Sequence, residues 1–173
     1  SRIANLDRLG LSQKDVVTIA SIVEKETNYS EEKGDLAMVY INRISSPNES
    51  AGYLQADPTS KFAVGELYLR RVTKKETQCD CPFNTYKTKG LPPAPICLPS
   101  KETIDAVLNA QPHEFYFFCA DPANFTLPRD QHKHILVTAI KWIKMYIEFS
   151  NNYAFLFAKR ISSIHCCGFL SAF

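Results

Sequence analysis

Residues 20–28 constrain the fold most, because a helical pattern of apolar residues ends there in two carboxylates, Glu24 and Glu26. Ser12, followed three residues later by Asp15, predicts the start of this helix as a weak capping box. One face at helical spacing then carries Val16, Ile19, Ala20, Val23 and Thr27. The sequence therefore predicts a buried helix with a pair of glutamates at its C-terminal end.

The two glutamates border the apolar stripe, whereas Lys25 between them faces the opposite side. Glu26 lies one turn beyond Ile22 and two turns beyond Ile19, so apolar side chains are expected behind it. A carboxyl group against apolar surface loses hydration, which raises its pKa and suits it to general acid catalysis near neutral pH. The alternative is an ordinary solvated helix end with two surface glutamates.

Length and composition fit one domain with a core of its own, since the chain has 173 residues, 45% of them hydrophobic. A net charge of +2 indicates neither a nucleic acid partner nor an anionic membrane surface. The sequence contains no signal peptide and no apolar run of about 18 residues. We therefore expect a soluble protein, or one whose targeting segment lies upstream of Ser1.

The six cysteines have spacings typical of neither a zinc site nor a disulfide framework. We expect mostly buried free thiols, with no metal and no cofactor. The alternative is a metal site formed by Cys79, Cys81 and Cys97 with a distant histidine.

Further elements follow along the chain. A second helix is expected from about Glu31 to Ile44, with Arg43 close to its inner face, either with its charge extended to solvent or paired with Glu24 or Glu26. Gln55 and Asp57 alternate with apolar residues, which predicts a short strand that points both polar side chains the same way. This segment is either a simple turn before Pro58 or a polar wall for a ligand rich in hydroxyls and amides.

The second half of the chain alternates loops with short elements. We expect a short helix and an extended piece in residues 61–72, an exposed insertion in 73–80, and a loop entering a strand in 81–86. Residues 90–96 are too rich in proline for a helix or a central strand and predict a rigid loop along one side of a cleft. The last expected elements are a helix from Ser100 to Ala110, a buried central strand over residues 114–120 and a helix over 129–149.

Four segments together resemble the MltG/YceG-like family of endolytic murein transglycosylases, in the order and at the spacing typical of that family. They are Ala20–Thr27, Val39–Ile44, Leu54–Thr59, and Phe83–Tyr86 with Gly90–Ile96. The resemblance covers roughly residues 10 to 145. It implies one α+β catalytic domain over residues 1–150, with helices packed on a small sheet, followed by a tail of unknown role over residues 151–173.

The resemblance also implies an activity, cleavage of the MurNAc–GlcNAc β-1,4 bond within glycan strands to leave a 1,6-anhydroMurNAc end. Glu26 would be the only acid and base required, protonating the glycosidic oxygen before the C6 hydroxyl of the sugar attacks. Glu24 would shape the site. The side chains expected to contact N-acetyl and hydroxyl groups are Gln55, Asp57, Asn84 and Tyr86.

Two alternatives to this activity remain open at the level of sequence. A hydrolase would need a second carboxylate, for which Asp57 is the only candidate. A non-catalytic glycan-binding domain is suggested by residues 121–125, which lack the histidine of the family's Gly-x-His-x-Phe motif. His132 is a candidate for a later family histidine, but Lys133 follows it where the family has asparagine.

The resemblance finally implies a location and partners. Family members are anchored in the inner membrane by one N-terminal helix, absent from this chain, and their catalytic domain is periplasmic or extracytoplasmic. The expected partners are peptidoglycan glycan strands and peptidoglycan synthases, with no nucleic acid.

Overall fold

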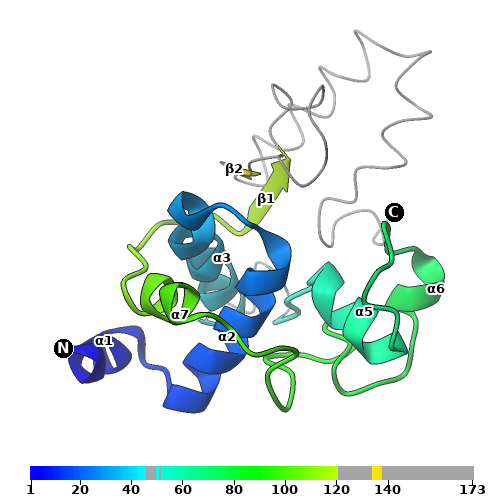
Figure 1. Ribbon diagram of the computed structural model, residues 1–173, viewed down its shortest axis with the longest axis horizontal. Helices are drawn as coiled ribbons and strands as arrows, with labels where there is room; N and C mark the ends of the chain where they lie inside the picture. Colours follow the sequence, from blue (N-terminus) through cyan, green and yellow to red (C-terminus); the bar gives the residue numbers. More distant parts are fainter. Residues whose placement is uncertain (46–49, 51, 121–133, 138–173) are drawn as a thin grey trace, which may run out of the picture.

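The computed structural model describes residues 1–45, 50, 52–120 and 134–137 of the chain (Figure 1). The described part is mainly helical, with two short strands. Its elements are α1 (Arg2–Leu9), α2 (Gln13–Glu26), η1 (Ser30–Glu32), α3 (Lys33–Ser45), α5 (Asp57–Val64), α6 (Lys74–Thr77), α7 (Lys101–Leu108), β1 (Phe117–Ala120) and β2 (His134–Val137).

Helix α2 begins and ends as its sequence predicts. The Ser12 hydroxyl accepts a hydrogen bond from the backbone N–H of Asp15 at 3.2 Å, and the Asp15 carboxylate accepts one from the backbone N–H of Ser12 at 3.0 Å. This reciprocal pair confirms the capping box. Ile19 and Ile22 are fully buried, so α2 is the central helix of its region.

Helices α2, α3 and α7 pack against one another around one apolar cluster (Figure 1). Its members include Ile19, Ile22 and Val23 of α2, Leu36, Val39 and Tyr40 of α3, and Val107 and Leu108 of α7. The predicted helix after Ser100 is confirmed, since the Ser100 hydroxyl caps α7 by accepting from the backbone N–H of Thr103 at 3.2 Å. We call α2, α3 and α7 the apolar region.

Helix α1 lies at the edge of the apolar region and has no buried residue. Arg2 donates two hydrogen bonds to the Asp105 carboxylate, at 2.8 and 3.0 Å, and Arg8 donates to the carbonyl oxygens of Leu108 and Ala110. These polar contacts tie α1 to α7, and Leu6 and Leu9 of α1 pack against the apolar cluster as well.

A second group of elements consists of α5, α6 and residues 81–90, which we call the polar region. Its buried polar side chains are Thr59, Ser60, Asn84 and Thr85. The short strand predicted around Gln55 and Asp57 is wrong, because Ala56 is the N-cap of α5 and Asp57 is already helical, with Pro58 in the first turn where proline is favoured. The strand predicted after Cys81 is also wrong, since residues 82–88 form turns and bends.

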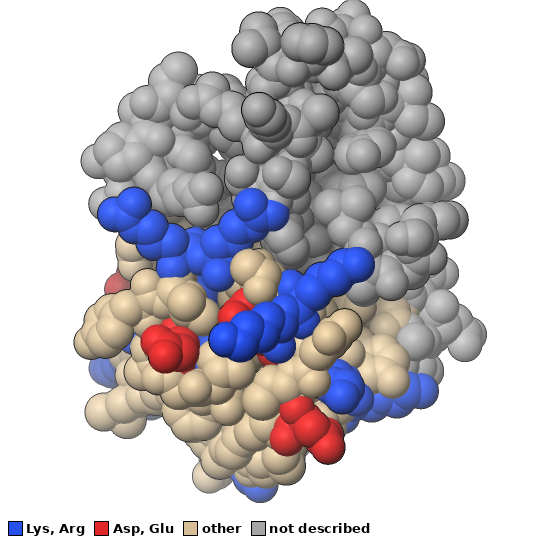
Figure 2. All heavy atoms as spheres, turned by 90° about the vertical axis from the view of Figure 1, so that its right-hand side faces the viewer, with Lys and Arg blue, Asp and Glu red and all other residues tan. Residues whose placement is uncertain are grey.

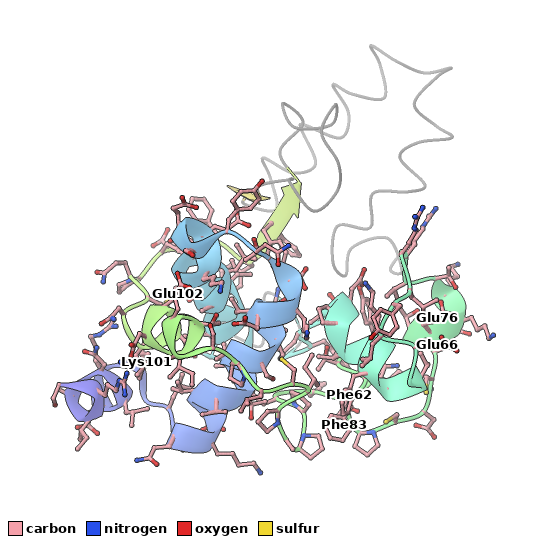
Figure 3. The ribbon with its side chains drawn as sticks, in the orientation of Figure 1. Phe62, Glu66, Glu76, Phe83, Lys101 and Glu102 are labelled. Carbon is pink, nitrogen blue, oxygen red and sulfur yellow. The ribbon has the colours of Figure 1, made fainter. Side chains whose placement is uncertain are left out.

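The neighbouring segments follow the sequence expectations in part. Residues 90–96 contain neither helix nor strand, as their prolines predict. The segment 73–80 contains the short helix α6, whose start is fixed by a capping box between Thr73 and Glu76. Phe62 of α5 packs against Phe83 with ring centroids 4.8 Å apart, and this contact joins the loop to the helix (Figure 3).

The strand predicted over residues 114–120 is present as β1, shortened to its last four residues. It pairs antiparallel with β2, with Phe117 opposite Val137 and Ala120 opposite His134. The helix predicted over residues 129–149 is therefore wrong at His134–Val137, because these residues pair with a strand. The rest of that segment and the expected tail, 151–173, lie outside the described residues, so the α+β packing of helices on a sheet and the domain limits stay predictions.

Candidate active site at the end of α2

Glu26 is the last residue of α2 and is half-buried, with its Oε2 atom shielded from solvent. Lys25 beside it is exposed. The chain that follows is held in place by Thr27, a buried residue whose hydroxyl donates to Glu32 and accepts from the backbone N–H of Tyr29 at 3.1 Å. The end of the helix therefore has a fixed geometry at the residue expected to act as the acid.

Glu24 has a different environment, although it lies only two residues away. Its Oε2 accepts hydrogen bonds from the hydroxyls of Ser100 and Thr103 and from the backbone N–H of Ser100. The ammonium of Lys33, a buried residue that also donates to Thr103 at 2.7 Å, lies 3.7 Å away. Burial alone raises the pKa of Glu24, but the hydrogen bonds from Thr103 and Ser100 and the charge of Lys33 outweigh it and hold the pKa below its usual value.

The bonds of Glu24 join the end of α2 to the start of α7 and to α3. A carboxylate held ionised by several donors is a poor proton donor. This geometry suits a residue that shapes the site, which is the role expected of Glu24.

Asp57 and Tyr86 lie together, since the Tyr86 hydroxyl donates to the Asp57 carboxylate at 2.6 Å. Asp57 is the first residue of α5, and Tyr86 lies in the loop that packs on this helix. Both residues are half-buried. They form a polar pair at the N-terminal end of α5.

Asn84 is fully buried and uses its whole hydrogen-bonding capacity within the protein. Its amide nitrogen donates to the carbonyl oxygens of Thr77 and Cys79, at 3.0 and 2.7 Å. Its amide oxygen accepts from the Ser60 hydroxyl at 3.0 Å and from the backbone N–H of Tyr86 at 3.2 Å. This environment does not favour direct contact with a sugar. It indicates instead that Asn84 holds the loop that carries Tyr86.

Gln55 is half-buried and has a left-handed backbone, with φ of 49°. Its backbone N–H donates to the Thr85 carbonyl at 3.1 Å, and the next N–H, of Ala56, donates to the Thr85 hydroxyl at 3.0 Å. Leu54 and Ala56 belong to the same buried cluster as Ile19 and its neighbours in α2. The Gln55 segment is thus joined to α2 through its buried neighbours and to α5 through the chain.

The supporting residues Arg43, Thr59, Ser60 and Thr85 were missed as a set by sequence reasoning. Arg43 was expected either to extend to solvent or to pair with Glu24 or Glu26. It is buried instead, and its guanidinium donates to the carbonyl oxygens of Leu54 and Tyr116. The signals in the sequence were the closeness of this arginine to an apolar helix face and the position of Arg43, Thr59 and Thr85 within the family-like segments.

The cysteines Cys79, Cys81 and Cys97 are free thiols, as expected, but are half-buried rather than buried. Burial raises the pKa of Cys97, whose thiol donates to the Ser21 carbonyl at 3.3 Å. Within the described ranges, no three histidine, cysteine or acidic side chains gather in a way that could hold a metal ion. The structure therefore gives no support to the alternative of a metal site here.

Comparison with known proteins gives consistent results. The chain is 32% identical over 105 residues to the endolytic murein transglycosylase of Bacillus subtilis (strain 168), an alignment that covers 61% of this chain and 28% of that protein. It is 32% identical over 115 residues to the protein of the same name from Streptococcus pneumoniae serotype 2 (strain D39 / NCTC 7466), covering 64% of this chain and 20% of that one. The chain therefore spans less than a third of the length of these relatives.

A solved structure agrees with these sequence matches. The crystal structure at 2.6 Å of a putative yceG-like protein from Listeria monocytogenes superimposes with a TM-score of 0.65 and 29% identity, covering 83% of this chain and 43% of that one. The model of the YceG-like family matches residues 2–136, most of the present sequence. The chain belongs to the YceG-like family.

Proposed function

We propose that this chain is the catalytic part of an endolytic peptidoglycan lytic transglycosylase, with Glu26 as its general acid and base. The relatives named endolytic murein transglycosylases support the reaction class. The observation that carries the assignment of the acid is the contrast between two nearby glutamates. Glu24 is held ionised by Ser100, Thr103 and Lys33, whereas Glu26 ends α2 with one carboxylate oxygen inside the protein.

The reaction requires two proton transfers, both through the Glu26 carboxyl group. Protonated Glu26 gives its proton to the glycosidic oxygen of a MurNAc–GlcNAc β-1,4 bond, the C1–O bond breaks, and positive charge develops at C1. The C6 hydroxyl of the same MurNAc then attacks C1, and ionised Glu26 accepts the hydroxyl proton. The products are a strand with a 1,6-anhydroMurNAc end and a strand with a free GlcNAc hydroxyl. Water is not consumed.

The remaining polar residues divide between contact and support in this proposal. Gln55 and the Asp57–Tyr86 pair are half-buried at the start of α5 and offer amide, carboxylate and hydroxyl groups to a sugar. Glu24 and Asn84 do not contact the sugar in this proposal. Glu24 fixes the end of α2, and Asn84 fixes the loop that carries Tyr86. Asp57 is already engaged by Tyr86, which suits a binding role better than activation of a hydrolytic water.

The decisive experiment is digestion of purified uncrosslinked glycan strands by the wild type and by Glu26→Gln, with products read by mass spectrometry. The expected result is anhydro-ended fragments from the wild type and none from the variant, because an amide cannot donate the required proton. Thermal denaturation of both proteins checks that Glu26→Gln remains folded. Fragments heavier by one water would identify a hydrolase. Intact strands in both samples, with strand binding retained, would identify a glycan-binding domain.

We also propose a location and partners, on the basis of the resemblance to the YceG-like family. We place the domain outside the cytoplasm, on a protein held in the inner membrane by an N-terminal anchor, beside peptidoglycan synthases. No helix among the described residues is long and apolar enough to cross a membrane. The catalytic proposal does not depend on this placement.

A further inference from the structure

Gln55 has a backbone conformation that most residues avoid. Among the described residues, it is the only non-glycine residue with positive φ, at 49°. The side chain of an ordinary residue is strained in this region, whereas glycine adopts it freely. Four other positions with positive φ are indeed glycine: Gly10, Gly52, Gly65 and Gly90. A turn needed only for its shape would favour glycine at position 55 as well, so the glutamine side chain is expected to have a use.

The backbone around Gln55 is held from two sides. Thr85 accepts the N–H of Gln55 with its carbonyl and the N–H of Ala56 with its hydroxyl, at 3.1 and 3.0 Å. The Thr85 hydroxyl also lies 2.7 Å from that of Thr59, which donates to the Ala56 carbonyl. On the other side, Arg43 donates through Nη1 to the carbonyl of Leu54. Buried side chains thus fix the peptide groups on both sides of the strained residue.

Arg43 itself has an unusual environment for a cation. Its side chain is 1% exposed, its Nε donates to the Tyr116 carbonyl at 2.7 Å, and it lies over the rings of Tyr40 and Phe117 at 5.9 and 5.3 Å. It forms no ion pair within the described part of the chain, and its Nη2 is buried there without a hydrogen-bond partner. A buried guanidinium without a carboxylate is costly. Two costly features, Arg43 and the Gln55 backbone, therefore meet at one turn.

Unlike its backbone, the Gln55 side chain is not engaged by the described part of the protein. No described residue forms a hydrogen bond with its amide, although the residue is only half-buried. A carboxamide offers both a donor and an acceptor and can pair with the N–H and C=O of an acetamido group. Local strain that the surroundings enforce is typical of ligand-binding positions.

We propose that Gln55 is a specificity-determining residue that binds an acetamido group of the sugar strand, and that Arg43 and Thr85 are positioning residues that enforce its left-handed conformation. The proposal rests on the proposed function for the identity of the ligand. It predicts that a substitution which relaxes the backbone at position 55 leaves the stability of the protein unchanged or raises it, but weakens the reaction.

The first test compares Gln55→Gly with Gln55→Asn. Glycine relieves the strain, so the melting temperature should stay the same or rise by about 2 °C, while kcat/KM on glycan strands falls about three- to tenfold through a raised KM. Asparagine tolerates the same backbone but has a shorter side chain. Its stability should be close to that of the wild type, with a similar loss of affinity.

The matched control is Gln78→Gly, the same chemical change at an exposed residue with an ordinary φ of −95°. It should lower stability slightly or leave it unchanged and should leave cleavage at the wild-type level. If Gln55→Gly instead kept wild-type kcat/KM, or lost stability together with activity, the strained backbone would not serve to place the Gln55 side chain for binding. The proposal would then be overturned.

The second test asks whether Arg43 acts through Gln55. Arg43→Lys retains the charge but loses the planar guanidinium that donates to the carbonyl oxygens of Tyr116 and Leu54. We therefore expect kcat/KM to fall in the wild-type background. In the Gln55→Gly background the same change should cause little further loss of kcat/KM, because the side chain to be positioned is already absent. Equal losses in both backgrounds would show that Arg43 does not act through Gln55. If Arg43→Lys fails to fold, Thr85→Ser and Thr85→Val replace it in the same cycle.

Failure of the proposed function remains distinguishable from failure of this inference. If the wild type cleaves no strand, binding of intact strands to the wild type, Gln55→Gly and Gln55→Asn is measured instead. Weaker binding by both variants at undiminished melting temperature would support the role of Gln55 in a binding domain. Equal binding by all three proteins would overturn it.

Discussion

The apolar and polar regions of this molecule are stabilised by different forces. In the apolar region, α2, α3 and α7 bury isoleucine, valine and leucine side chains against one another. In the polar region, the fully buried side chains of α5 and the following loop are Thr59, Ser60, Asn84 and Thr85, which form hydrogen bonds with one another and with the backbone. Apolar burial is non-directional, whereas each hydrogen bond requires a defined geometry.

This difference matches the function that we propose for each region. Glu26, the proposed acid, ends a helix of the apolar region and needs a rigid base with little hydration. Asp57 and Tyr86, two of the proposed sugar contacts, lie in the polar region, and Gln55 lies next to it in the chain, where Thr85 fixes its backbone. We infer that the apolar region is built for stability and the polar region for positioning.

The two regions also differ in surface charge. Residues 57–90 carry seven basic and four acidic side chains, although the whole chain has a net charge of only +2. Lysine and arginine side chains gather on the α5–α6 side of the molecule (Figure 2). Residues 57–90, which include the polar region, therefore present a basic surface (Figure 2).

The largest effect is expected from a cavity in the apolar region. Leu36→Ala removes a side chain of α3 that is 1% exposed and should lower the free energy of unfolding by about 2–5 kcal/mol. Urea denaturation measures this change, and Leu98→Ala, at a residue that is 95% exposed, is the control with no expected loss. Among molecules that remain folded, the cleavage rate should stay near that of the wild type. A tenfold lower rate in folded protein would contradict the division between stability and positioning.

A smaller loss of stability but a larger loss of function is expected in the polar region. Thr85→Val keeps the shape of the side chain and removes the hydroxyl that serves Ala56 and Thr59. The free energy of unfolding should fall by about 1–3 kcal/mol, because buried polar groups lose their partner. The cleavage rate of folded protein should fall as well, since the Gln55 turn loses one of its anchors.

The matched control for this change is Thr88→Val, the same substitution in the same loop at a half-buried threonine. Thr88 contributes only its backbone N–H, which donates to the Asn84 carbonyl at 2.9 Å. Neither stability nor cleavage should change appreciably. If Thr85→Val behaved like Thr88→Val, the hydrogen bonds of the polar region would not be what positions its residues.

The same contrast explains what the sequence could predict. Helix α2 follows from local signals, the capping box at Ser12 and an apolar stripe at helical spacing. The polar region depends on bonds between distant residues, Ser60 with Asn84 and Thr59 with Thr85, which no local pattern reveals. The alternation of polar and apolar residues around Gln55 predicted a strand. The left-handed backbone of Gln55 could not be recognised from the sequence, because only glycine marks such a conformation by residue type.

Two further elements also depend on contacts between distant residues. Helix α1 is held by Arg2 and Arg8, which contact residues about a hundred positions away, and by Leu6 and Leu9, which pack against the apolar cluster. The β2 residues His134–Val137 lie in a segment that was expected to be helical and form a strand by pairing with β1. Within the site, Glu26 and the Asp57–Tyr86 segments could be named from sequence because the family motifs mark them. Arg43 and Thr85 lie in the same family-like segments, but their supporting hydrogen bonds to the Gln55 turn required the structure.

The smallest effect is expected at the boundary of the site, where Glu24 joins α2 to α7. Its folded-state pKa lies below the 4.5 of a free glutamate, so ionised Glu24 stabilises the fold above about pH 4.5, and this stabilisation is lost as the pH falls through the folded-state pKa. Glu24→Gln should lower the melting temperature slightly at neutral pH. The difference from the wild type should shrink on acidification, because both side chains are then uncharged. About a quarter of the Glu24 side chain is exposed, which limits the size of this effect.

Glu102→Gln is the control for this titration, since Glu102 is exposed in the first turn of α7 beside the same helix end (Figure 3). The two variants separate a half-buried, hydrogen-bonded carboxylate from an exposed carboxylate on a neighbouring element. If Glu24→Gln kept a constant difference from the wild type at every pH, its hydrogen bonds rather than its charge would hold α2 to α7. If Glu24→Gln abolished cleavage while leaving the melting profile unchanged, Glu24 would take part in the chemistry. The assignment of Glu26 as the single acid would then fail, because the contrast between the two glutamates is what supports it.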